Sequence, residues 1–134
     1  MKRGPRVGGV TVALVLILVA LLALDAQRAR VAVRLVAQLR FGSLTPVARE
    51  YFAQASATAP IDTLVGGLPL RRMYAAAART ARPVSGGRVG DTLYVDYATS
   101  LRWCSLADEP NDLQVRFVRD HGRWRAVSAE PFPC

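Results

Sequence analysis

The most prominent pattern in the sequence is an uninterrupted apolar run near its beginning, Val7–Leu24. This run contains 18 residues without a charged side chain, and Thr11 carries its only side-chain hydroxyl. As an α-helix with a rise of 1.5 Å per residue, it spans about 27 Å, close to the hydrocarbon core of a bilayer. A helix that is apolar on all sides needs lipid or a larger protein around it. We therefore predict a transmembrane helix over residues 7–24, preceded by a basic tail over residues 1–6.

A cleaved signal peptide also joins a basic start to an apolar run, so the end of the run separates the two possibilities. Signal peptidase sites follow a small-x-small pattern. Here Leu24 lies two residues before Ala26, and Leu21 lies two residues before Ala23. Because no A-x-A motif ends the run, the sequence favours an uncleaved signal anchor over a cleaved signal peptide.

Residues 25–42 predict an arginine-rich amphipathic juxtamembrane helix, because polar side chains recur there at steps of three and four residues. Two interpretations remain open. The helix lies in the membrane interface with its apolar side in the acyl boundary, or it continues the anchor and its arginines snorkel. Gly42 favours a helix end at Phe41, because glycine is common just past a helix C-terminus. The predicted membrane-interface residues are Arg28, Arg30, Arg34 and Arg40.

Residues 43–134 begin with helical signals. Pro46 suits the first position of a helix, and Thr45 before it is a candidate cap. Pro60 ends this helix, and residues 60–67 allow a short helical turn before Gly-Gly. Pro69 opens a further alanine-rich helix. The apolar positions predicted to face the core are Val47, Tyr51, Phe52 and Ala55 in the first helix, and Leu70, Met73, Tyr74 and Ala77 in the second.

After Pro83 the apolar period changes to two. Residues 85–91 predict a turn-rich loop, and Thr92–Cys104 alternates as one long strand. Strands are also expected over residues 113–117 and 123–128, and the proline-rich tail over residues 130–134 is expected to leave the sheet. The fold class is therefore α+β: an N-terminal transmembrane helix, then two or three helices packed on a curved antiparallel sheet of at least three strands.

The charge distribution favours a membrane over nucleic acid, although the formal net charge is +8. Residues 1–41 carry seven of the 18 basic side chains and a single acid, Asp25, whereas residues 42–134 carry 11 arginines and nine acids. The basic excess thus flanks the apolar run, where anionic headgroups are met. The expected partners are the lipid bilayer and a protein of the cell envelope, with no nucleic acid, and the oligomeric state stays open.

Cys104 and Cys134 are the two cysteines, and their positions at two element ends favour a disulfide. In the chain-entropy model a loop of this size contributes roughly 3.5 kcal/mol. The alternative is a buried Cys104 with an unpaired Cys134. A disulfide requires an oxidising compartment, so we expect a single-pass protein of the cytoplasmic membrane, with its N-terminus inside and its C-terminal domain outside. Two cysteines and one histidine make a metal site unfavourable, and no cofactor is expected.

Candidate catalytic residues are few. His121, the single histidine, lies in a predicted hairpin turn, where a general base would be solvated. Tyr94 and Asp96 share one side of a strand, and such a pair can polarise a carbonyl and move a proton. The alternative is that both face solvent, or that Asp96 pairs with an arginine, Arg102 or Arg125. Trp124 follows the inward alternation and is expected in the core.

Three segments, Thr45–Phe52, Gly90–Val95 and Val115–Val127, resemble the opening helix, a strand entry and the final hairpin of the nuclear transport factor 2-like (cystatin-like α+β) superfamily. The resemblance covers about residues 44–130 and extends to small membrane-anchored bacterial members. It implies a conical domain with a pocket between sheet and helices, which in enzymes carries Asp, His or Tyr. Anchored members are often accessory or assembly subunits of envelope complexes, including secretion machines.

These observations predict a membrane-anchored accessory or assembly protein that is not an enzyme and whose extracytoplasmic domain binds a partner protein. One alternative is a small-ligand-binding or enzymatic pocket in the same fold. A second alternative is a membrane-helix subunit of a larger complex. A filled core and an exposed apolar patch would favour the first interpretation, and converging polar groups with shifted pKa values would favour the pocket.

Overall fold

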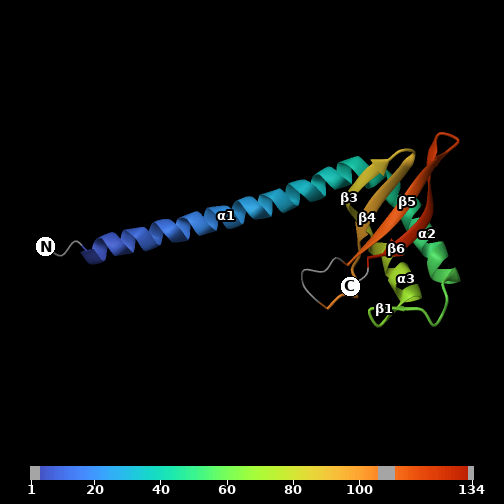
Figure 1. Cartoon of the computed structure of the whole chain (residues 1–134), viewed down its shortest axis with the longest axis horizontal. Helices are drawn as coiled ribbons and strands as arrows, with labels where there is room; N and C mark the ends of the chain where they lie inside the picture. The colour runs from blue at the N-terminus through green and yellow to red at the C-terminus, as the bar shows by residue number, and fades with distance from the viewer. Residues whose placement is uncertain (1–3, 106–110, 133–134) are drawn as a thin grey trace. The chain divides into compact units, whose positions relative to one another are not determined.

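The computed structural model describes residues 4–105 and 111–132 (Figure 1). Internal contacts divide the chain into two units, residues 1–33 and residues 34–134. Each unit is described by itself. Lys2, Arg3 and Cys134, which belong to the predicted tail and disulfide, lie outside the described residues.

The first element, α1, is a single helix over Gly4–Phe41. It includes an apolar window with a mean hydropathy of 2.6, long and apolar enough to cross a membrane. This confirms the expected N-terminal helix that is long and apolar enough to span a membrane. The predicted anchor and juxtamembrane segments form one helix, in line with the absence of Gly and Pro between residues 10 and 41.

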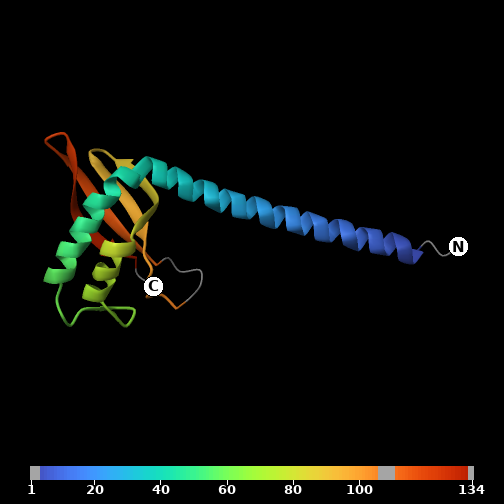
Figure 2. The same ribbon diagram turned by 180° about the vertical axis from the view of Figure 1, so that it is seen from behind.

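The second unit has two layers, and its fold class is α+β as predicted. Its main sheet has four antiparallel strands in the order β3-β4-β5-β6. Two α-helices, α2 and α3, cover one face of this sheet (Figures 1 and 2). The bounds are η1 Gly42–Leu44, α2 Thr45–Thr58, β1 Leu64–Val65, β2 Leu68–Pro69, α3 Leu70–Thr80, β3 Arg82–Val89, β4 Thr92–Ala98, β5 Asp112–Asp120 and β6 Arg123–Pro131.

The core lies between the two layers, because apolar residues alternate along the strands and recur every three to four residues on the helices. The inward residues of β4 and β5 are buried, and of the predicted helix faces Phe52, Met73, Tyr74 and Ala77 are buried. Leu70 is partly buried. Val47, Tyr51 and Ala55 are partly buried against this core. The largest fully buried side chains are Tyr97, Phe52, Phe117, Met73, Leu113, Val95 and Val115.

The expected loop over residues 85–91 was wrong, because most of it belongs to strand β3. Gly86 pairs with Val95 and Gly87 pairs with Tyr94. A Cβ at Gly86 would lie 2.7 Å from Phe41 Cζ and 2.7 Å from the Tyr94 carbonyl oxygen. This glycine therefore lets the Phe41 ring pack directly on the sheet, and its role is close packing.

The expected long strand Thr92–Cys104 was too long, since β4 ends at Ala98. Beyond it the backbone bonds to side chains: the N–H groups of Trp103 and Cys104 both donate to Asn111 Oδ1, at 2.7 Å each. Conversely, β6 continues to Pro131, which pairs with Leu113. Proline is tolerated there because β6 is an edge strand.

Two local expectations near the helices were also wrong. Residues 60–67 form no helical turn but lead into the hairpin of β1 and β2, whose Gly66 and Gly67 have φ of 57° and 81°. Thr45 does not cap α2, because the N-cap position is Leu44 and no side chain bonds there. Within the described residues the buried Thr45 hydroxyl has no hydrogen-bond partner.

Candidate functional site

The centre of the space between the helices and the sheet is filled by aromatic side chains. The Phe52 ring meets the Tyr97 ring edge-on at 6.0 Å and stacks on the Tyr74 ring at 6.2 Å. Tyr97 and Phe52 are fully buried, with Met73 beside them. The centre of this interior is thus occupied by core packing, and a hollow of about 520 Å³ lies where α2 faces β6, lined by Val47, Glu50, Tyr51, Gln54, Arg125, Ala126 and Val127.

Tyr97 brings a buried hydroxyl into this interior. Its hydroxyl has no hydrogen-bond partner among the described residues. Burial raises the pKa of the Tyr97 phenol well above its usual value. The phenol therefore stays neutral at physiological pH, and nothing in its surroundings prepares it to give up a proton.

The polar side chains of the strands converge instead on the opposite face of the sheet, which we call the open face. It contains a hollow of about 280 Å³. Arg116 and Glu130 bring opposite charges to this hollow, and within the described structure they form no ion pair. The hollow is lined by Tyr94, Gln114, Arg116, Ser128 and Glu130.

Asp96 lies on the same open face and joins three strands. Its carboxylate accepts a hydrogen bond from Ser85 Oγ at 2.7 Å and another from Gln114 Nε2 at 3.1 Å. Ser85 on β3 and Gln114 on β5 are its cross-strand neighbours. The candidate pair Tyr94 and Asp96 therefore shares one face, and Asp96 uses neutral partners.

Arg102 and Arg125, the expected partners of Asp96, form no ion pair with it in the described structure. Arg125 Nη1 lies 3.6 Å from Asp120 Oδ2, and no described ion pair joins Asp96 to Arg102. Asp112, also on β5, has a pKa raised first by burial and then by the negative charge of Asp96. Two carboxylates thus lie close enough to interact, next to the neutral donors of the open face.

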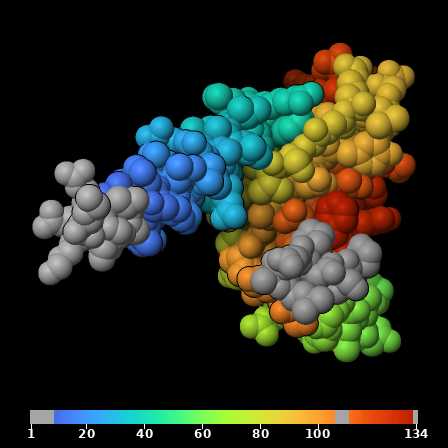
Figure 3. All heavy atoms as spheres, turned by 60° about the vertical axis from the view of Figure 1, so that its left-hand side comes forward, coloured from blue at the N-terminus to red at the C-terminus, as the bar shows by residue number. Residues whose placement is uncertain are grey.

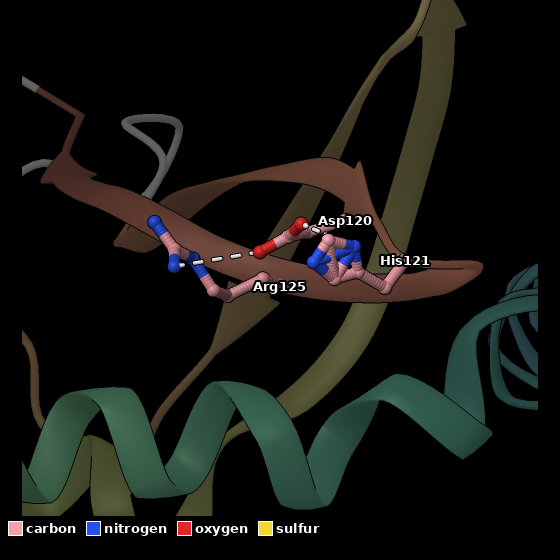
Figure 4. Close-up of polar contacts among 3 residues, drawn as sticks. All are labelled: Asp120, His121 and Arg125. Atoms are coloured by element: carbon pink, nitrogen blue, oxygen red, sulfur yellow. Dashed lines mark ion pairs between the residues drawn. The ribbon is translucent and has the colours of Figure 1, made fainter.

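His121 lies at the tip of the β5–β6 hairpin, as the sequence predicts (Figure 4). Its side chain is 92% exposed, and Nδ1 lies 3.6 Å from Asp120 Oδ1. It adopts a positive φ of 51°, next to Gly122 at 77°. An imidazole in bulk solvent at a turn has no oriented partner for proton transfer.

The remaining predicted residues do not converge on the open face. Cys104 is buried, and its expected partner Cys134 lies outside the described residues. All four membrane-interface arginines are exposed on α1. Arg40 places its guanidinium 5.1 Å from the Phe41 ring centroid. In the described part of the chain no cluster of three or more His, Cys, Asp or Glu side chains could hold a metal.

Sequence reasoning singled out Tyr94 and Asp96 but missed the groups that surround them. Gln114 and Arg116 carry a readable signal, since they alternate with the buried residues of β5. Ser85 carried no such signal, because its strand was read as a loop. Ser128 lies at the hollow because it pairs with Arg116 of β5. A bulge in β6 shifts the strand register between Arg116 and Phe117, and this register could not be read from the sequence.

Comparison with known proteins adds no relative: no protein-family model, curated protein or solved structure matches this chain. The resemblance to the nuclear transport factor 2-like superfamily therefore stays a prediction.

Proposed function

We propose that this chain is a single-pass accessory or assembly protein of the cytoplasmic membrane, and that its domain outside the cytoplasm binds a partner protein without catalysing a reaction. The observation that carries this proposal is the filled interior around Tyr97 and Phe52. An enzyme of the predicted superfamily would need that space for substrate. The polar groups that do converge lie on an open sheet face, where a protein surface has access.

Residue chemistry supports the open face as the contact surface. Tyr94 and Arg116 belong to the residue types that most often anchor protein interfaces, because they combine apolar area with directed hydrogen bonds. Asp96, Gln114 and Ser85 form a fixed row of polar groups beside them. A partner bound at the open face would be oriented by hydrogen bonds to Asp96, Gln114 and Ser85. Tyr94 would provide contact area.

The location outside the cytoplasm rests on the proposed disulfide between Cys104 and Cys134. Trp103, which precedes Cys104, donates from Nε1 to the Phe132 carbonyl oxygen at 3.1 Å. Residue 132 is therefore held beside the segment that carries Cys104, two residues before Cys134. A bond between the two sulfurs would close this end of the domain in an oxidising compartment.

Site-specific photocrosslinking in the native membrane tests the contact surface. The full chain carries a photoreactive residue either at Arg116 on the open face or at Arg72, an exposed position of α3. We expect a discrete protein adduct from position 116 only. The adduct should disappear when Tyr94→Ser is combined with the probe. Equal adducts from both positions, or none from position 116, would contradict the proposed surface.

A small polar ligand is the second candidate, favoured by one observation: Arg116 and Glu130 share the hollow of about 280 Å³ without pairing to each other in the described structure. Such a pair of charges would suit a zwitterion. Asp96→Ala separates the candidates, since it should abolish an activity of the open face but leave a broad protein contact largely intact.

A further inference from the structure

The ends of the two β-hairpins carry a stacked group of side chains that the open face does not include. Arg88 on β3 places its guanidinium carbon 5.7 Å from the Trp124 ring centroid, and Arg119 on β5 does so at 5.2 Å. Trp124 is half-buried and packs against the edge of the core. We call Arg88, Arg119 and Trp124 the tryptophan cluster.

The cluster presents positive charge that is not neutralised. A guanidinium stacked on an indole uses its flat face, so its N–H groups remain available in the plane. Arg88 donates one of these hydrogen bonds, from Nε to the Gly90 carbonyl oxygen at 2.9 Å. In the described structure the nearby Asp120 pairs with Arg125 and His121 instead, and neither arginine of the cluster has a carboxylate partner.

The cluster lies at the end of the domain where α1 joins it. The Phe41 ring, at the end of α1, packs on Gly86, which is two residues from Arg88 along β3. Figure 3 shows the teal end of α1 beside the yellow strand β3. Arg40 adds a further guanidinium at this place, over the Phe41 ring. The last residues of α1, which belong to the second unit, thus lie beside the strand that carries Arg88.

We propose that the tryptophan cluster binds the phosphate groups of anionic lipids in the bilayer that holds α1. Arginine forks match phosphate geometry, and tryptophan favours the headgroup region of membranes. Basic residues near an anionic surface each add to this attraction. Because the anchor and the cluster belong to the same chain, the anchor also raises the effective concentration of lipid at the cluster. The proposal uses the membrane anchor of the proposed function but not its protein partner.

Tryptophan quenching in vesicles tests the proposal with the full-length chain. The protein is reconstituted into phosphatidylcholine vesicles with a headgroup spin-labelled lipid as quencher, and phosphatidylglycerol is raised stepwise. We expect quenching to rise with phosphatidylglycerol and to fall again in 1 M salt, because added ions screen exposed charges. Trp124→Phe should remove the response, since the other indole, Trp103, is buried.

Matched charge variants identify the residues responsible. Arg88→Gln with Arg119→Gln should raise the phosphatidylglycerol fraction at half-maximal quenching by at least about fivefold, given the usual attraction per basic residue. Arg72→Gln with Arg79→Gln removes the same charge from α3 and should leave the midpoint unchanged. If the first pair lowers stability, Arg88→Lys with Arg119→Lys keeps the charge but loses the planar fork, so its midpoint should lie between those of the unchanged chain and the glutamine pair.

Three results would overturn the proposal. The first is equal quenching with and without phosphatidylglycerol in protein that resists carbonate extraction, which would leave the anchor intact. The second is an equal loss in both glutamine pairs, which would indicate net charge alone. The third is a change in Trp124 fluorescence with soluble polyglutamate but none with phosphatidylglycerol. This result would assign the cluster to an acidic protein. Failure to insert into vesicles at all would refute the anchor instead.

Discussion

The buried hydroxyl of Tyr97 allows a sharp test of the packing. Its oxygen is fully enclosed and has no hydrogen-bond partner among the described residues. Burying an unsatisfied hydroxyl costs about 1–3 kcal/mol, because its hydrogen bonds to water are lost without replacement. Tyr97→Phe removes this cost and forfeits only a few contacts of about 0.1–0.2 kcal/mol each. We expect the free energy of unfolding to rise by about 1 kcal/mol.

Tyr74→Phe is the matched control, since Tyr74 lies in the same aromatic group but its hydroxyl donates to the Ala129 carbonyl oxygen at 3.0 Å. Loss of a satisfied hydrogen bond should lower the free energy of unfolding by about 1 kcal/mol. The two variants should therefore shift stability in opposite directions. Urea unfolding of the full chain in detergent micelles, followed by tryptophan fluorescence, measures both free energies.

The pH dependence gives the same test a second readout. The pKa of Tyr97 is raised in the folded domain, so above pH 10 the unfolded chain loses the phenol proton while the folded domain retains it. Stability from this group is therefore complete below pH 10 and falls as pH rises further. Tyr97→Phe should flatten that fall. A loss of 1 kcal/mol or more at neutral pH would refute the reasoning and indicate a bonded partner such as an internal water.

Three further predictions concern packing, charge and the cysteines. Gly86→Ala should lower the free energy of unfolding by about 1–3 kcal/mol, because its Cβ would meet Phe41 and backbone; Gly87→Ala, with nothing within 4 Å, should be neutral in the same urea unfolding. Asp112→Asn should stabilise the domain at pH 7 but not at pH 3, because the raised pKa of Asp112 means that stability falls as pH rises through its usual value of 3.8. In intact cells, Cys104 and Cys134 should react with an impermeant maleimide only after an impermeant reductant is added, and labelling only after lysis without reduction would contradict the proposed location.

Alternation along the strands was sufficient to predict the layers of the domain. Leu93, Val95 and Tyr97 recur at every second position, and this spacing alone directs them to the helices. The same rule directed Tyr94 and Asp96 to the open face. Local pattern suffices in these cases because each residue's orientation follows from its own strand.

The failures arise where distant residues decide the local structure. Glycine is common in turns because its backbone is flexible, so Gly86 suggests a turn. In the fold it belongs to strand β3, where the close approach of the Phe41 ring requires a residue without a Cβ. Trp103 continues the alternation of β4, but the side chain of Asn111 draws the backbone out of the ladder. The partners of Asp96 depend on strand register, and a single sequence does not specify the register of β3 or the bulge in β6. Contacts of this kind require the folded domain.

The two edges of the sheet are closed to other chains by different means. On β6, the hydroxyls of Tyr51 and Tyr74 bond the carbonyl oxygens of Val127 and Ala129, so an incoming strand would have to displace both helices. On β3, Pro83 removes one donor and Arg88 adds charge, two devices by which natural sheets resist edge-to-edge pairing. If the proposed anchor confines copies of this chain to two dimensions, these closed edges would disfavour pairing between their sheets.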